Sequence, residues 1–135
     1  MRKSARTIAM SLAGAFVVIC CLALNASAQT GSQPTPVRFE MGRTTAILKG
    51  RADNAHGFTY ILAAKKGQTM TVHLTAPGGG AAIFSITAPG GPIEDALEVK
   101  DWNGELPDTG NYLIAVWNKK KRGAAIAYTI ELTIR

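Results

Sequence analysis

The sequence predicts an all-β fold, a small antiparallel β-sandwich of about seven to eight strands. Apolar and polar residues alternate with a period of two in several short segments. The chain's 14 glycines and 6 prolines interrupt nearly every window long enough for a helix, and no such window keeps an apolar period near 3.6. Short strands joined by turns over roughly 100 residues are typical of a sandwich.

The first 28 residues have the features of a cleavable secretory signal peptide. Three cations precede an apolar segment at 8–24, and the small-x-small pattern that signal peptidase reads ends at Ala28. A retained membrane anchor fits less well, because the apolar segment is short for a span. Lipidation is also disfavoured, since Cys20 and Cys21 lie inside the apolar segment and Ile19 stands directly before Cys20, where a lipoprotein site has a small residue. We expect export to the periplasm, without membrane insertion after cleavage.

Cleavage would leave about 107 residues, enough for one small domain. Residues 29–36 are polar and contain two prolines, so we expect a disordered leader there. The pattern of strands and turns begins at Val37, which places the sandwich at 37–135. No cysteine follows Cys21, so this domain has neither a disulfide nor a thiol nucleophile.

Six strands can be placed from the pattern, at 44–49 (ended by Gly50), 58–64, 69–75, 82–87, 112–117 and 126–135. The third points Met70, Val72 and Leu74 inward and Thr69, Thr71, His73 and Thr75 outward. The last points inward Ile126, Tyr128, Ile130, Leu132 and Ile134. The strand at 112–117 is apolar on both faces, as expected of a central strand covered on both sides. Segment 94–102 reads either as a short edge strand or as a loop.

The basic run Lys119-Lys120-Lys121-Arg122 separates the last two strands, so we expect a hairpin with a cationic tip. Such a run is usually a solvated turn. Held on a rigid hairpin, however, its cations could enter an acidic cleft and pair with carboxylates there.

Catalytic chemistry finds little support. Neither serine of the mature chain, Ser32 or Ser85, has a nucleophile elbow or an obvious base, and His73 is better explained as part of a solvated strand face than as a zinc ligand. The glycine runs precede a strand or a proline, which favours turns over phosphate binding. Calcium is disfavoured because no Asp-x-Asp loop is present. We therefore expect no enzyme activity, no cofactor and no metal.

The charge balance argues against nucleic acid as a partner. The formal net charge of +6 falls to about +3 once the cations of the signal peptide are removed. Two tryptophans could stack on sugars, although both fit core or edge packing better. Trp102 is the more exposed candidate, because Trp117 lies within an apolar strand.

Several motifs lie along the predicted domain: Val37-x-Phe39-x-x-Gly42, Tyr60, Ala64-Lys-Lys-Gly-Gln68, Leu106-Pro-x-x-Gly110-x-Tyr112 and Tyr128 with the alternating last strand. Together they resemble the bacterial periplasmic inhibitors of g-type lysozyme. The two turn motifs are also shared with sandwiches similar to the bacterial pre-peptidase C-terminal domain. The resemblance covers nearly all of 37–135.

This resemblance implies that loops at one end of the sandwich enter the substrate cleft of a lysozyme, a protein partner. The family's arginine-bearing loop matches Lys119, Lys120, Lys121 and Arg122, mostly lysines, which lack the bidentate fork of arginine. Its second contact, an aromatic residue between the first two strands, falls in 51–56, where His56 is the nearest ring. The alternative is a carbohydrate- or envelope-binding module using Trp102 and the face of Thr69, Thr71, His73 and Thr75. The lysozyme class and the oligomeric state stay open.

Overall fold

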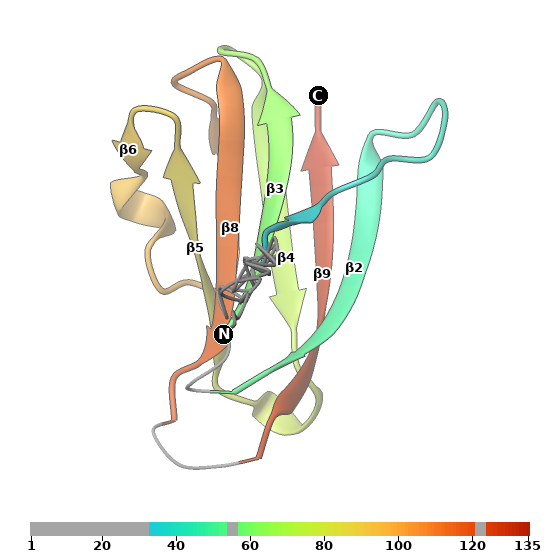
Figure 1. The fold of residues 1–135 in the computed structure, drawn as a ribbon, viewed down its shortest axis with the longest axis vertical. Helices are drawn as coiled ribbons and strands as arrows, with labels where there is room; N and C mark the ends of the chain where they lie inside the picture. Colours follow the sequence, from blue (N-terminus) through green and yellow to red (C-terminus); the bar gives the residue numbers. More distant parts are fainter. Residues whose placement is uncertain (1–32, 54–56, 121–123) are drawn as a thin grey trace, which may run out of the picture.

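Two β-sheets pack face to face in the computed structural model, which describes residues 33–53, 57–120 and 124–135 (Figure 1). The five-stranded sheet has the order β1-β3-β8-β5-β6 and the four-stranded sheet the order β2-β9-β4-β7. The strands are β1 Thr35–Pro36, β2 Thr45–Ala52, β3 Phe58–Ala64, β4 Thr69–Thr75, β5 Ala82–Ala88, β6 Gly91–Pro92, β7 Asp101–Glu105, β8 Gly110–Asn118 and β9 Ile126–Ile134, with 3₁₀ turns η1 Pro77–Gly79 and η2 Glu94–Ala96. The predicted all-β sandwich is confirmed.

The core lies between the sheets and is built from the alternation seen in the sequence. In β4 and β9 the residues expected to point inward are buried or half-buried, and their neighbours point to solvent. β8 occupies the centre of its sheet, between β3 and β5. Its inner face is fully buried, while Leu113, Ala115 and Trp117 on its outer face are half-buried. The strand is therefore central, as expected, but its outer face is only partly covered.

Gly50 does not end the first long strand as expected. β2 continues to Ala52 and pairs Gly50 with Tyr128 of β9. A Cβ atom at Gly50 would lie 2.5 Å from the Tyr128 hydroxyl oxygen, closer than real atoms approach. The glycine is therefore in the strand because the tyrosine ring occupies the space above it.

The basic run does not lie on a hairpin, which corrects the sequence interpretation. β8 already has β3 and β5 on its two edges, and β9 has β2 and β4 on its own. Neither strand has a free edge for the other, so the connection between them crosses from one sheet to the other. Sequence neighbours joined by a short turn usually pair, and here the sandwich topology overrides that tendency.

Segment 94–102 links the two sheets along one side of the molecule. After η2, Val99 exchanges backbone hydrogen bonds of 2.9 Å with Phe84 of β5, and the carbonyl of Lys100 accepts a bond of 2.8 Å from the N–H of Leu74 in β4. β7 then begins at Asp101 as the edge strand of the four-stranded sheet. The segment is thus partly loop and partly edge strand.

β1 falls within the segment expected to be a disordered leader. Thr35 and Pro36 pair in parallel with Tyr60 and Ile61 of β3, and the N–H of Val37 donates to the carbonyl of Ile61 at 2.9 Å. Regular pairing therefore begins two residues before the expected domain boundary at Val37.

The two turn motifs noted in the sequence meet at the end of the sandwich where β3 finishes. The Gly67 N–H donates to the Leu106 carbonyl at 2.9 Å, and the Leu106 N–H to the Gln68 carbonyl at 2.8 Å. The Tyr112 hydroxyl donates to the Asp108 carbonyl at 2.7 Å and accepts from the Asp108 N–H at 3.0 Å. These bonds fix the entry into β8, the strand that leads to the basic run.

Candidate functional site

Three connections meet at the opposite end of the sandwich, the lower end in Figure 1. They join β2 to β3, β4 to β5 and β8 to β9. The N–H of Asn118 donates to the carbonyl of Asp53 in the first connection at 3.2 Å, and the N–H of Lys119 to the carbonyl of Ala81 in the second at 2.9 Å. The start of the third connection is therefore held between the other two. We call this region, residues 51–53, 57, 76–81, 118–120 and 124–125, the loop end.

Cations gather at and beside the loop end. A terminal N–H of Arg51 donates to the Ala125 carbonyl at 3.1 Å, and Lys100 Nζ to the Gly80 carbonyl at 3.0 Å. Lys119 and Lys120 are exposed. Lys119 Nζ lies 3.6 Å from Glu98 Oε2, with both side chains more than half exposed, so solvent screens this ion pair and it holds the ammonium only loosely.

Asn118 is a site residue that the sequence reasoning missed. Its side chain is 1% exposed, and its Oδ1 accepts the Lys120 N–H at 3.0 Å. Through this bond and the bond to Asp53, one residue fixes the position of two connections. An asparagine directly before a run of exposed lysines is typical of a side-chain turn, and that pattern could have identified it.

The structure brings together the two loops that the sequence analysis singled out. Lys119 and Lys120 lie at the loop end, next to the start of the β2–β3 connection at Asp53. The other three candidate contacts, Lys121, Arg122 and His56, lie outside the described residues.

The proposed sugar surface that combines Trp102 with the polar strand face is wrong in its geometry. Trp102 is 7% exposed and pairs with Val72, so it lies on the inner face of the sheet, whereas Thr71 and His73 lie on the outer face. Gly104 makes this possible, because its missing side chain leaves room for the Trp102 ring. The indole Nε1 finds no acceptor among the residues that the structure describes.

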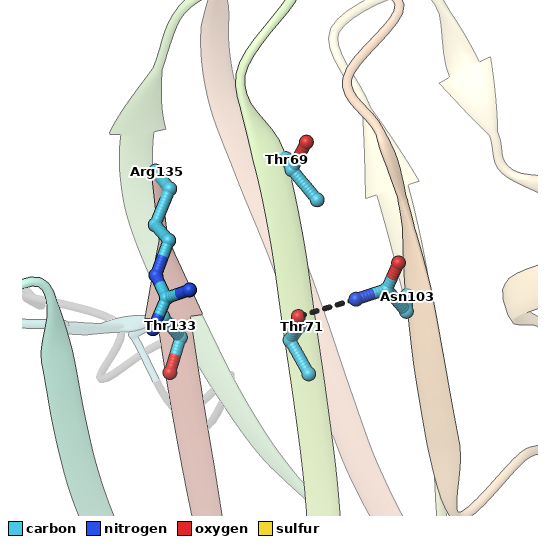
Figure 2. Close-up of a pocket in the computed structure, with 5 residues that line it drawn as sticks. All are labelled: Thr69, Thr71, Asn103, Thr133 and Arg135. Carbon is cyan, nitrogen blue, oxygen red and sulfur yellow. Dashed lines mark hydrogen bonds between the residues drawn. The ribbon is translucent and has the colours of Figure 1, made fainter.

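A polar groove of about 230 Å³ nevertheless runs over that outer face. Its lining residues come from three adjacent strands, and Figure 2 shows them: Thr69, Thr71, Asn103, Thr133 and Arg135. The Asn103 amide donates to Thr71 Oγ1 at 2.6 Å. Further along the same face, His73 Nδ1 contacts Asp101 Oδ1.

Within the described ranges, no three His, Cys, Asp or Glu side chains are grouped closely enough to hold a metal ion. The same ranges contain no helix with the length and apolar character needed to cross a membrane. No protein-family model and no curated protein sequence matches the chain.

Solved structures do match it. The PliG protein of Aeromonas hydrophila, a periplasmic lysozyme inhibitor of g-type lysozyme, is 33% identical, with a TM-score of 0.64 over 76% of this chain and 96% of that one. PliG of Salmonella Typhimurium is 22% identical, with a TM-score of 0.63 over 76% of this chain and 98% of that one.

The sandwich itself extends beyond these inhibitors. The pre-peptidase C-terminal domain of a Bacillus anthracis collagenase is 12% identical and superposes with a TM-score of 0.52 over 76% of this chain and 97% of that domain, a likeness of fold alone. The Aeromonas protein is 33% identical to this chain and is matched over 96% of its length, and this similarity establishes the family. The chain belongs to the PliG family of periplasmic lysozyme inhibitors.

Proposed function

We propose that the protein inhibits lysozyme, of the g-type, by placing its loop end in the substrate cleft of the enzyme. Two observations support this. Three solved structures similar to this chain are named as inhibitors of g-type lysozyme, and the exposed cations Lys119 and Lys120 lie at one end of the sandwich. The position of Lys119 and Lys120 is the observation on which the proposed mechanism rests.

Lysozymes cut glycosidic bonds with carboxyl groups placed in a cleft that holds an extended sugar chain. Cations brought into that cleft would pair with the carboxylates and exclude both the sugar and the attacking water. The inhibitor needs no catalytic group for this. We propose that the protein is not an enzyme and that Lys119, Lys120, Lys121, Arg122 and His56 make the contacts.

The loop end is organised before any partner arrives. Its connections are held by backbone hydrogen bonds of 2.9 and 3.2 Å, and the buried Asn118 fixes the backbone at Lys120. Because the backbone at Lys119 and Lys120 is already fixed, these two residues lose little backbone conformational entropy on binding, and more of their interaction energy is available for affinity.

A matched pair of variants tests the mechanism in a cell-wall lysis assay with g-type lysozyme. Lys119→Gln/Lys120→Gln removes two charges at the loop end. Lys65→Gln/Lys66→Gln removes two exposed charges from the β3–β4 turn at the opposite end. We expect the first variant to weaken inhibition by at least tenfold and the second to leave it within twofold, with equal thermal stability.

If both variants weakened inhibition equally, the net charge of the protein would act at long range. The loop end would then not be the surface that contacts lysozyme. Unchanged inhibition in both would exclude the two lysines. Titration against c-type and i-type lysozymes in the same assay tests the class, and inhibition of either at the same protein concentration would overturn g-type selectivity.

We also propose that the protein acts in the periplasm after loss of residues 1–28. The family members are named as periplasmic proteins, and the first residues have the pattern of a signal peptide. N-terminal sequencing of protein from a periplasmic extract should begin at Gln29, and an intact Met1 would contradict this.

A further inference from the structure

The polar groove on the outer face of the four-stranded sheet lies away from the loop end and has no part in the proposed inhibition. Its lining residues are held in register by the sheet. Thr71 pairs with Asn103 on one side and with Thr133 on the other. Thr69 and Arg135 exchange backbone hydrogen bonds of 2.8 and 3.0 Å. The spacing of the side chains is therefore fixed by strand geometry.

The hydrogen bonds within the groove leave groups available for a ligand. Thr71 Oγ1 accepts a hydrogen bond from the Asn103 side-chain amide at 2.6 Å, so the hydroxyl hydrogen of Thr71 is free to donate elsewhere. The Thr133 and Thr45 hydroxyls share one bond of 2.9 Å, which leaves one further donor between them. The groove thus presents polarised hydroxyls as well as the carbonyl oxygen of Asn103.

Arg135 adds a strong donor. Its side chain extends along β9 towards Thr133 (Figure 2). Among the residues that the structure describes, its guanidinium is in no ion pair. Its N–H groups therefore face the groove and solvent, and oxygen atoms of a ligand can reach them.

A second hollow adjoins the groove and shares Thr71 and Asn103 with it. Its lining adds His73 and Asp101 together with Val72 and Trp102, and it is mostly apolar. From Thr69 to His73 the strand advances about 13 Å. An elongated ligand therefore fits this surface better than a compact one.

The charges on this face restrict the kind of ligand. Asp101, Glu105 and Glu131 pair with Thr69 or His73 and lie exposed on the same outer face as Arg135. Lys49 and Arg51 of β2 also lie exposed on this face, opposite Thr129 and Ala127 of β9. Three carboxylates and three cations leave the face without a net charge that would select a polyanion or a polycation. A chain of hydroxyl groups can donate to the carboxylates and accept from arginine and threonine. We propose that the outer face of the four-stranded sheet binds a neutral glycan chain along β4.

This binding goes beyond the proposed inhibition and uses different residues. The groove lies on a sheet face and the cations lie at the loop end, so both can be occupied at once. A protein that holds a glycan chain on one face would keep its loop end close to the sugars that a lysozyme attacks.

The test is an NMR titration of the ¹⁵N-labelled protein with chitotetraose, a neutral tetrasaccharide. We expect saturable amide shifts concentrated at Thr69, Thr71, Asn103 and Thr133. Thr71→Val keeps the shape and the strand preference but loses the hydroxyl, and it should weaken binding about five- to tenfold. Thr129→Val makes the same change on the outer face of β9, outside the groove, and should leave binding within twofold.

Arg135→Gln gives a second test that does not disturb the strand pairing, and it should weaken binding by a similar factor. No saturable shifts at millimolar sugar, or equal loss in Thr71→Val and Thr129→Val, would overturn the proposal. Tighter binding of the acidic tetragalacturonate than of chitotetraose would overturn the proposal that the ligand is a neutral glycan.

Thr71→Val should still inhibit lysozyme and Lys119→Gln/Lys120→Gln should still bind chitotetraose, so the two proposals can fail separately.

Discussion

The hydroxyl groups of Tyr60 and Tyr128 meet across the core, with their oxygen atoms 2.7 Å apart. Tyr60 belongs to β3 of the five-stranded sheet and Tyr128 to β9 of the four-stranded sheet. Both side chains are buried. This polar contact joins the two sheets within a largely apolar interior, and each hydroxyl depends on the other for a partner.

Removing both of these hydroxyls should cost less than the sum of the costs of removing each one alone. Tyr128→Phe leaves the Tyr60 hydroxyl buried without its partner, and we expect a loss of about 1–3 kcal/mol in the free energy of unfolding. In Tyr60→Phe/Tyr128→Phe no orphaned hydroxyl remains, so the double variant should be less destabilised than the sum of the two single variants. Urea denaturation measures all three, and strict additivity would show that the pair is not coupled.

Alkaline pH should weaken the fold through the same tyrosine. Burial raises the pKa of Tyr128 far above its ordinary value of 10.0, and its hydrogen bond with Tyr60 raises it further. Below pH 10 the folded and unfolded states both keep this proton, so its contribution to stability is complete. Above pH 10 only the unfolded state releases it, and stability falls by up to about 1.4 kcal/mol per pH unit.

Thermal unfolding between pH 9 and 11.5 measures this effect. The melting temperature should fall less steeply in Tyr128→Phe than in the unchanged protein, because the lysines that titrate in this range are common to both. Parallel curves would mean that Tyr128 ionises equally in the two states.

Gly50→Ala should destabilise the protein strongly. The added methyl group would lie 2.5 Å from the Tyr128 hydroxyl oxygen and 2.8 Å from the ring carbon that bears it. The ring has to move, which disturbs the contact with Tyr60, and we expect a loss of about 2–3 kcal/mol. Lys49→Ala, at an exposed neighbouring position of β2, is the control and should change stability by less than about 0.5 kcal/mol. Similar losses of stability in Gly50→Ala and Lys49→Ala would show that the packing of Tyr128 against Gly50 is not the cause.

Asn118 should matter for inhibition through the backbone that it positions. Asn118→Ala removes the acceptor of the Lys120 N–H, and we expect several-fold weaker inhibition in the lysis assay. Asn118→Asp keeps an oxygen at that place and should inhibit better than Asn118→Ala, whatever its thermal stability. If inhibition instead follows thermal stability across the two variants, Asn118 serves only the fold.

Strands with one buried face could be predicted from the sequence almost residue by residue. β3 and β4 begin and end where expected, because each is a run of strand-forming residues bounded by turn residues such as the left-handed Gly67. In β4 the apolar residues also alternate with polar ones. Local sequence determines such elements. The inward face of β9 was likewise clear, since only one face of it is apolar.

Features that depend on distant residues could not be predicted in this way. Gly50 was taken as a strand end because nothing near it in sequence reveals the ring of Tyr128. The basic run was placed on a hairpin because the competing partners of β8 and β9 lie far along the chain. The burial of Trp102 agrees with the core or edge packing that the sequence favoured, whereas its place on the inner face depends on the absence of a side chain at Gly104. The polar strand face was identified, and its groove required the arrangement of three strands.

The order of strands in the four-stranded sheet has a consequence for how the chain assembles. β9 is the last strand in sequence, yet it lies between β2 and β4 and pairs with both. β2 has no other partner within that sheet. During synthesis from the N-terminus, the sheet therefore stays split into separate parts until β9 emerges. The four-stranded sheet can therefore assemble only once β9 is available. A chain halted before Ile126 should remain sensitive to proteases.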